Sequence, residues 1–197
     1  TLCFELLNNI KDKETDLIEN YAKQVPVITI ARLLGIPEEM SDQLLKWSNT
    51  MVAVYQADTS EHTKNLADQS SREFYEYIEK YVNERRTKPA DDLITHLINA
   101  EEDNEKLSFD ELISTCILLL NAGHEATVHT IGNGIKALLT NKVECRFLKE
   151  KDWQIIVEEI LRYDPPLHIF TRFAYKNLTI DNIEISYGEK ISLVIGA

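Results

Sequence analysis

The segment from Ser108 to about Leu139 most constrains what this chain can fold into. Ser108 precedes Phe109, and Glu111 follows three residues after Ser108, a spacing typical of the capping box that begins a helix. Apolar residues then recur at helical spacing for about 30 residues, which corresponds to roughly 45 Å of helix. A helix of that length must cross a whole domain, so we expect it to be the central element of the fold.

The rest of the sequence predicts a mainly α protein with a small β-sheet near the C-terminal end. Pro26 is expected to separate two helices within residues 16–35, and Gly35 to end the second. A polar loop is expected over residues 101–106. Apolar spacing predicts the other helices over residues 2–10, 38–57, 61–86, 91–100 and from Asp152 to Tyr163, and short strands over residues 171–176, 178–180, 183–185 and 190–195.

Charge and cysteine content exclude several classes of partner. The net charge of −12 argues against nucleic acid or an anionic membrane surface. The longest apolar stretch, residues 116–120 with its neighbours, is too short to span a bilayer, and no signal peptide is evident. The three cysteines, Cys3, Cys116 and Cys145, form no CxxC pair. We therefore expect reduced, buried thiols in a cytoplasmic protein.

The first motif with chemical content lies in the middle of the long helix. Gly123 costs a helix about 1 kcal/mol relative to Ala, and its neighbour Ala122 is also small. Glu125 and Thr127 place an acid and a hydroxyl within one turn of this thin stretch. Two interpretations remain open. Either a flat group approaches the helix here, or Gly123 permits tight helix packing while Thr127 bonds back to a carbonyl.

A zinc site formed by His124 and His129 is a tempting alternative. The zinc peptidase motif HExxH separates its histidines by four residues, which places both on one helix face. Here the separation is five residues, which rotates the second imidazole by roughly 140° relative to the first. We therefore do not expect these histidines to share a metal ion.

The second motif begins on the helix that precedes Pro165 and Pro166. Glu159 and Arg162 are three residues apart, so they can form an ion pair on the helix surface. Arg172 follows shortly after the two prolines, at the start of a predicted strand. An arginine held there can point its guanidinium at an anionic ligand group.

Together these motifs resemble the cytochrome P-450 family of haem-thiolate monooxygenases, in particular its soluble bacterial members. Residues 122–125 resemble the family's AGxET or AGxDT motif, Glu159 and Arg162 its ExxR pair, and Arg172 with Ala174 its Arg-x-Ala segment. The resemblance spans essentially the whole chain. It implies that residues 1–197 are part of a single P-450 domain, a partial P-450 fold around the long central helix.

The resemblance also implies a function and a set of site residues. The full-length protein would activate O2 at haem iron and oxidise a small apolar substrate in the cytoplasm, with electrons from a ferredoxin-type partner and with neither nucleic acid nor membrane involved. Glu159 and Arg162 would form a structural ion pair. The implied roles are proton relay by Glu125 and Thr127, haem contact by Ala122, Gly123 and Arg172, and substrate contact by Leu119, Ile169 and Phe170.

Two departures from the family pattern qualify this expectation. The family usually has Thr directly after the acid, whereas this chain has Ala126, and Thr127 is rotated by about 100° from that position. No segment resembles the loop that carries the cysteine ligand, so we expect that ligand outside this chain, which we interpret as truncated at both ends. The alternative is a non-catalytic remnant that acts as a helical interaction module without haem. In either case we expect exposed apolar surface and association.

Overall fold

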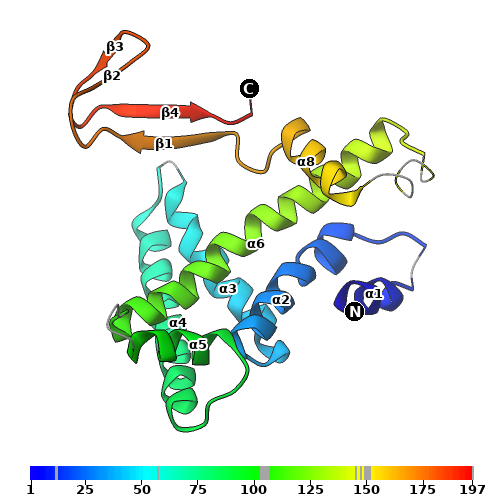
Figure 1. Ribbon diagram of the computed structural model, residues 1–197. Coiled ribbons are helices and arrows are strands. Elements are labelled where there is room, and N and C mark those ends of the chain that lie inside the picture. Colours follow the sequence, from blue (N-terminus) through cyan, green and yellow to red (C-terminus); the bar gives the residue numbers. More distant parts are fainter. Residues whose placement is uncertain are drawn as a thin grey trace. The chain divides into compact units, whose positions relative to one another are not determined.

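The structure is a computed structural model. It describes residues 1–11, 13–56, 58–102, 107–144, 146, 148 and 152–196. The chain divides into two compact units, Thr1–Val128 (unit 1) and His129–Ala197 (unit 2). The longest helix, α6, runs over Phe109–Thr140 and contributes residues to both units (Figure 1). The fold is mainly α with small antiparallel sheets, as the sequence predicts.

The regular elements in the described part of unit 1 are all helices. The long helices α3 and α4 pack along each other, and α2 and α5 pack against this pair. No helix in the described part of the chain is long and apolar enough to cross a membrane. The elements of unit 1 are α1 (Leu2–Asn9), a π-helical turn (Ile18–Ala22), α2 (Gln24–Leu34), a 3-10 turn (Glu38–Met40), α3 (Ser41–Val52), a second 3-10 turn (Ala53–Tyr55), α4 (Glu61–Thr87), α5 (Leu93–Glu102) and the first part of α6.

Several predicted boundaries differ from the observed ones. The break between the two helices of residues 16–35 lies at Lys23, whereas Pro26 lies in the first turn of α2, where its missing N–H removes no helical hydrogen bond. The third predicted segment, residues 38–57, is divided into α3 and two flanking 3-10 turns, and its last residue, Ala57, lies outside the described residues. The predicted loop at residues 101–106 is wrong at its start because α5 continues through Glu102. Its residues 103–106 lie outside the described part.

The capping box at the start of α6 is confirmed. The Ser108 amide donates to Glu111 Oε2 at 2.8 Å, and the Glu111 amide donates to Ser108 Oγ at 3.3 Å. The hydrogen bonds from Ser108 hold the pKa of Glu111 below its usual range. These bonds satisfy amides that would otherwise lack partners at the helix start.

A closed hydrophobic core occupies unit 1. Phe74 of α4 is fully buried and stacks on Trp47 of α3 with 5.2 Å between ring centroids. The Trp47 indole N–H donates to Glu73 at 2.9 Å, which satisfies the one polar atom of that ring. The fully buried large side chains are contributed by five helices and include Val27, Leu34, Leu44, Phe74, Ile78, Val82, Ile94, Leu112, Ile113 and Leu120.

A buried ion pair joins the ends of α2 and α4 to the start of α5. Gly35 ends α2 with φ of 75°, a backbone conformation that favours glycine. Arg85 donates to Asp92 Oδ2 and also to the Gly35 carbonyl, at 2.9 Å. Burial alone would raise the pKa of Asp92, but hydrogen bonds from Arg85 and Thr95 outweigh it and hold that pKa below its usual range.

Unit 2 combines the end of α6 with α8 (Trp153–Tyr163) and four short strands. Asp152 caps α8 by accepting from the Gln154 amide at 2.9 Å, in agreement with the predicted helix start. The strands form two separate antiparallel pairs, where the sequence suggested one sheet. The pairs are β1 (Ile169–Phe173) with β4 (Lys190–Val194), and β2 (Leu178–Ile180) with β3 (Ile183–Ile185).

Local residue chemistry explains the strand geometry. Asp181 and Asn182 both have positive φ values, 46° and 66°, which form the tight turn between β2 and β3 that short polar residues tolerate. β1 begins at Ile169, two residues before the predicted start, because Ile169 and Phe170 pair with Val194 and Leu193. Pairing with a distant strand is not visible in a local sequence window.

Candidate functional site

A strip of exposed apolar side chains runs along the middle of α6. Leu118, Leu119, Ala122 and Ala126 are exposed, whereas the opposite side of the helix is buried. Leu118, Ala122 and Ala126 are spaced four residues apart and therefore lie on one helix face. The two alanines make this face thin at its centre. A flat apolar group could therefore lie against this part of the helix.

Gly123 lies away from this strip and approaches α2. A Cβ added to Gly123 would lie 3.0 Å from Ile30 Cδ1. Because adjacent helical residues are rotated by about 100°, Gly123 faces Ile30 while Ala122 points outward on the strip. This geometry favours the helix-packing interpretation for Gly123, and it leaves Ala122 as the small residue available to a flat ligand.

Glu125 lies at the edge of a cavity of about 440 Å³ within unit 1. Asn49, Ala53 and Gln56, from the end of α3 and the turn after it, also line this cavity. The cavity therefore has the Glu125 carboxylate and the side-chain amides of Asn49 and Gln56 in its lining. Such amides can donate to a carboxylate or hold water. The prediction that Glu125 handles protons is compatible with this location.

Thr127 uses its hydroxyl within the helix. Its Oγ1 donates to the Gly123 carbonyl at 2.8 Å, a back-bond that threonines commonly make in helices. The hydroxyl oxygen can still accept a hydrogen bond. Ala126, which occupies the place where the family usually has Thr, lies on the exposed strip.

Glu159 and Arg162 form a two-point ion pair on α8. Arg162 Nε and Nη2 donate to the two carboxylate oxygens of Glu159, both at 2.7 Å. The hydrogen bonds from Arg162 lower the pKa of Glu159. Both side chains are largely exposed, so the pair by itself contributes little to the stability of unit 2.

The predicted residues of β1 lie close together within unit 2. Ile169, Phe170 and Arg172 are exposed, and the Arg172 guanidinium carbon lies 4.0 Å from the centroid of the Phe170 ring. Arg172 also donates to the Thr171 carbonyl at 3.0 Å. Stacking on Phe170 restricts the guanidinium and leaves donors available to an anionic group.

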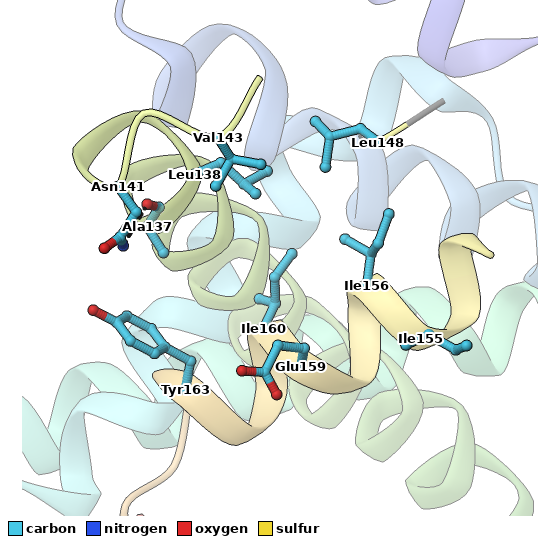
Figure 2. A pocket seen from close by; sticks show the side chains of 10 residues that line it. All are labelled: Ala137, Leu138, Asn141, Val143, Leu148, Ile155, Ile156, Glu159, Ile160 and Tyr163. Atoms are coloured by element: carbon cyan, nitrogen blue, oxygen red, sulfur yellow. Dashed lines mark hydrogen bonds between the residues drawn. The ribbon is translucent and has the colours of Figure 1, made fainter. Parts of the chain in front are cut away.

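An apolar groove in unit 2 was not predicted from the sequence. It has a volume of about 450 Å³ and lies between the end of α6 and one side of α8 (Figure 2). Leu138 and Val143 line one side, and Ile156 and Ile160 line the other. At Gly134 the two helices come close, because an added Cβ would lie 2.8 Å from Ile160 Cδ1. In the sequence, Gly134 in the middle of a predicted helix was the feature that could have indicated this close approach of two helices.

The buried cysteine of the central helix, Cys116, does not offer a thiolate. Burial raises the pKa of Cys116 to about 12, so its thiol stays protonated at neutral pH. Cys3 is exposed, so the expectation of a buried thiol is wrong for this residue, whereas Cys116 is buried as expected. Cys145 lies outside the described residues. Among the described residues, no group of three or more His, Cys, Asp and Glu side chains is arranged to hold a metal ion.

Comparison with known proteins assigns the chain to a family. The family model described as "Cytochrome P450" matches residues 13–151. The chain is 42% identical to the polyketide biosynthesis cytochrome P450 PksS of Bacillus subtilis over 95% of its own length, and 37% identical to the vitamin D(3) 25-hydroxylase of Pseudonocardia autotrophica over 94%.

Solved structures agree with this match. The structure of PksS superposes with a TM-score of 0.86 at 40% identity and covers 99% of this chain. P450BioI in complex with an acyl carrier protein ligated to hexadec-9Z-enoic acid superposes with a TM-score of 0.89 at 29% identity. The chain spans about half the length of these relatives, 46% of PksS and 51% of the P450BioI chain. The chain belongs to the cytochrome P450 family.

Proposed function

We propose that the protein to which this chain belongs is a haem-dependent monooxygenase that oxidises a small apolar molecule. The observation that carries this proposal is the thin apolar strip at Leu118, Ala122 and Ala126, on the central helix of a chain that belongs to the P450 family. Residues 1–197 would then form part of a single P450 domain. The proposed location is the cytoplasm.

The small exposed side chains of the strip in unit 1 suit one face of a haem, and the exposed Arg172 guanidinium in unit 2 suits a carboxylate. Ala122 and Ala126 would lie against the flat macrocycle, and the Arg172 guanidinium would bind a carboxylate of the ring. When bound, haem supplies the reductive activation of O2. The axial thiolate would come from a cysteine outside residues 1–197, because no segment of this sequence resembles the loop that carries the family's cysteine ligand.

Other side chains would handle protons and the substrate. The Glu125 carboxylate, with the amides of Asn49 and Gln56 beside it, would hold a proton or an ordered water next to the strip. The Thr127 hydroxyl oxygen can accept a hydrogen bond while its own O–H donates to the Gly123 carbonyl. Leu119, Ile169 and Phe170 would exclude water and contact an apolar substrate.

Two features of the partners belong to the same proposal. A ferredoxin-type protein would deliver the electrons. The relatives include a P450 described by its role in polyketide biosynthesis and one crystallised with an acylated carrier protein. A free or carrier-bound apolar chain is therefore a suitable first substrate to test.

Haem uptake tests the proposal. The purified chain would be mixed with hemin and with the two segments of PksS that flank the matched region, reduced, and exposed to CO. We expect the absorption band of a thiolate-ligated haem from this mixture and not from the chain alone. Ala122→Phe should reduce haem uptake by about tenfold, because a large ring would occupy the strip.

A matched control separates this effect from general damage. Ala100 is an exposed alanine near the end of α5, so Ala100→Phe should leave haem uptake unchanged. A mixture that assembles but takes up no haem would support the non-catalytic interaction module. Equal uptake by the Ala122→Phe variant and the unmodified chain would contradict the role of the strip.

A further inference from the structure

We propose that Trp47, Tyr77 and Tyr81 form a chain of oxidisable side chains that supplies one electron from the surface of unit 1 to a strong one-electron oxidant at the apolar strip of α6. The inference goes beyond the proposed substrate oxidation, because such a chain would protect the protein when no substrate consumes the oxidant. The oxidant would arise from the haem chemistry of the proposed function, and on that point alone the inference rests on it.

The three rings lie in series between α3 and α4. The ring centroids of Trp47 and Tyr77 are 5.6 Å apart, and those of Tyr77 and Tyr81 are 5.2 Å apart. Both distances lie within the contact range of aromatic pairs, where an electron passes directly from ring to ring. Trp47 is almost fully buried, whereas Tyr77 and Tyr81 are partly exposed. The series therefore runs from the interior of unit 1 to solvent.

Met51 connects Trp47 to the strip. It follows Trp47 by four residues on α3, so the two side chains are neighbours on one helix face. The Met51 sulfur lies 4.0 Å from Asn121 Nδ2, and Asn121 immediately precedes Ala122 of the strip. The polarisable thioether thus lies between the central helix and the indole.

Glu73 provides a base for the proton of Trp47. The indole N–H donates to Glu73 Oε2 at 2.9 Å. Hydrogen bonds from Trp47 and Gln69 hold the pKa of Glu73 below its usual range, so this carboxylate is ionised at neutral pH. An indole that has lost an electron is strongly acidic, and a carboxylate already in contact with its N–H can take the proton.

The two tyrosines add chemistry that packing alone does not require. Phe74 also stacks on Trp47, with 5.2 Å between ring centroids, but a phenyl ring is too difficult to oxidise to supply an electron. Burial and a hydrogen bond with Tyr81 raise the pKa of Tyr77, so its phenol stays protonated at neutral pH. The tyrosines are therefore the neighbours from which an oxidised Trp47 can be reduced.

Electrons and protons balance over the whole chain. The oxidant takes one electron from Trp47, and the indole proton moves to Glu73. Trp47 then regains its proton from Glu73 and an electron that passes from Tyr81 through Tyr77. Tyr81 has lost one electron, and its phenol proton passes to water. A small-molecule thiol or ascorbate would restore Tyr81 by donating a hydrogen atom.

Photo-oxidation of the full chain without haem tests the proposal. A ruthenium polypyridyl complex would be attached at position 122 through Ala122→Cys, in a background of Cys3→Ser, Cys145→Ser and Trp153→Phe. The buried Cys116 thiol stays protonated at neutral pH, so the label should not react with it. A flash in the presence of an external electron acceptor converts the label into a one-electron oxidant on the strip. We expect the transient absorption of a neutral tryptophanyl radical, followed by that of a tyrosyl radical.

Two conservative variants separate the steps. Glu73→Gln keeps an acceptor for the indole N–H but removes the base, so the tryptophan radical should keep its proton and show the absorption of a radical cation. Tyr77→Phe keeps an aromatic ring next to Trp47 but breaks the chain. The tyrosyl signal should be lost in this variant, and the tryptophanyl radical should persist.

Tyr75→Phe is the matched control. Tyr75 lies on α4 two residues before Tyr77 and therefore about 200° away around the helix, and its hydroxyl donates to Asp110. The variant removes a hydrogen-bonded phenol from the same helix but not from the chain. Both radical signals should remain in it.

Three results would overturn the proposal. The first is a labelled chain that forms no tryptophanyl radical after the flash. The second is an undiminished tyrosyl signal in Tyr77→Phe, which would mean that another tyrosine supplies the electron. The third is an equal loss of the tyrosyl signal in Tyr75→Phe and Tyr77→Phe. Because haem is omitted, failure of haem uptake would leave these results unaffected.

Discussion

Units 1 and 2 differ in how they bury apolar side chains, although one continuous helix contributes to both. In unit 1, Phe74, Ile78 and their neighbours are fully buried in a single core. In unit 2, Phe170, Phe173 and most other large apolar side chains remain exposed. Regular secondary structure is present in both units, so the difference shows that local pattern and capping can specify helices and strands where a core does not yet stabilise them.

The largest expected effect comes from a matched pair of phenylalanines. Phe74 is fully buried in unit 1, and Phe173 is 60% exposed in unit 2. Phe74→Ala should lower the free energy of unfolding by about 4 kcal/mol, because it leaves a cavity beside Trp47. Phe173→Ala should change it by less than about 0.5 kcal/mol.

Urea unfolding in a Trp153→Phe background measures both variants. Trp47 and Trp153 are the two tryptophans of the chain, one in each unit, so the remaining fluorescence reports unit 1 alone. If Phe173→Ala destabilised unit 1 as much as Phe74→Ala does, the two units would unfold together and the comparison would fail.

The Arg85–Asp92 pair provides the next largest effect and a pH dependence. Asp92→Asn should cost about 3 kcal/mol at neutral pH, because it removes the buried counterion of the Arg85 guanidinium and leaves only the half-exposed Glu84 carboxylate, at 3.4 Å. The pKa of Asp92 is lower in the folded chain than its usual value. Its ionised form therefore stabilises unit 1 above the unfolded pKa, near 4, and this contribution is lost as the pH falls below that value.

Unfolding curves between about pH 7 and pH 3 would measure this dependence. The unmodified chain should lose stability more steeply below pH 4 than the Asp92→Asn variant does. Parallel curves would show that the ion pair does not depress the pKa of Asp92 in solution.

Two glycines with positive φ provide a third comparison. Gly35 has φ of 75°, and an added Cβ would lie 2.1 Å from Asp92 Oδ2, whereas Gly188 in unit 2 has φ of 84° and nothing within 4 Å of such a Cβ. Gly35→Ala should cost about 2 kcal/mol in unit 1 through backbone strain and displacement of the ion pair. Gly188→Ala should leave the Trp47 transition unchanged. A shift of that transition by Gly188→Ala would indicate that the turn before β4 supports unit 1.

The sequence predicts helix starts that depend on neighbouring residues. It does not predict helix rotation or cavities, which depend on residues distant in the chain. Ser108 with Glu111 and Asp152 with Gln154 are local pairs, and they begin helices as expected. The rotation of α6, which points Gly123 at Ile30, depends on where α2 packs, so the sequence left two interpretations open. The groove beside Ile160 depends on the packing of two helices and could not be derived from either alone.

The ExxR pair shows the same limit within the candidate site. Spacing alone predicts that Glu159 and Arg162 can pair, and they do. The exposure of both side chains, and the place of Glu159 in the lining of an apolar groove, depend on tertiary contacts. Family motifs in the sequence indicated the family of this chain, whereas the coordinates show which residues lie on exposed surfaces.

The smallest expected effect compares helix caps in the two units. Ser108 caps α6 in unit 1, and Asp152 caps α8 in unit 2. Ser108→Ala should lower the free energy of unfolding, measured by Trp47 fluorescence, by about 1 kcal/mol because the Glu111 amide loses its partner, the Ser108 hydroxyl. Asp152→Ala removes a similar cap, but it should not change this transition if unit 2 unfolds separately. It should instead speed hydrogen exchange in the first turn of α8. If both variants lowered the free energy of unfolding by the same amount, α6 and α8 would unfold in one cooperative transition. The core that α6 shares would then also stabilise α8.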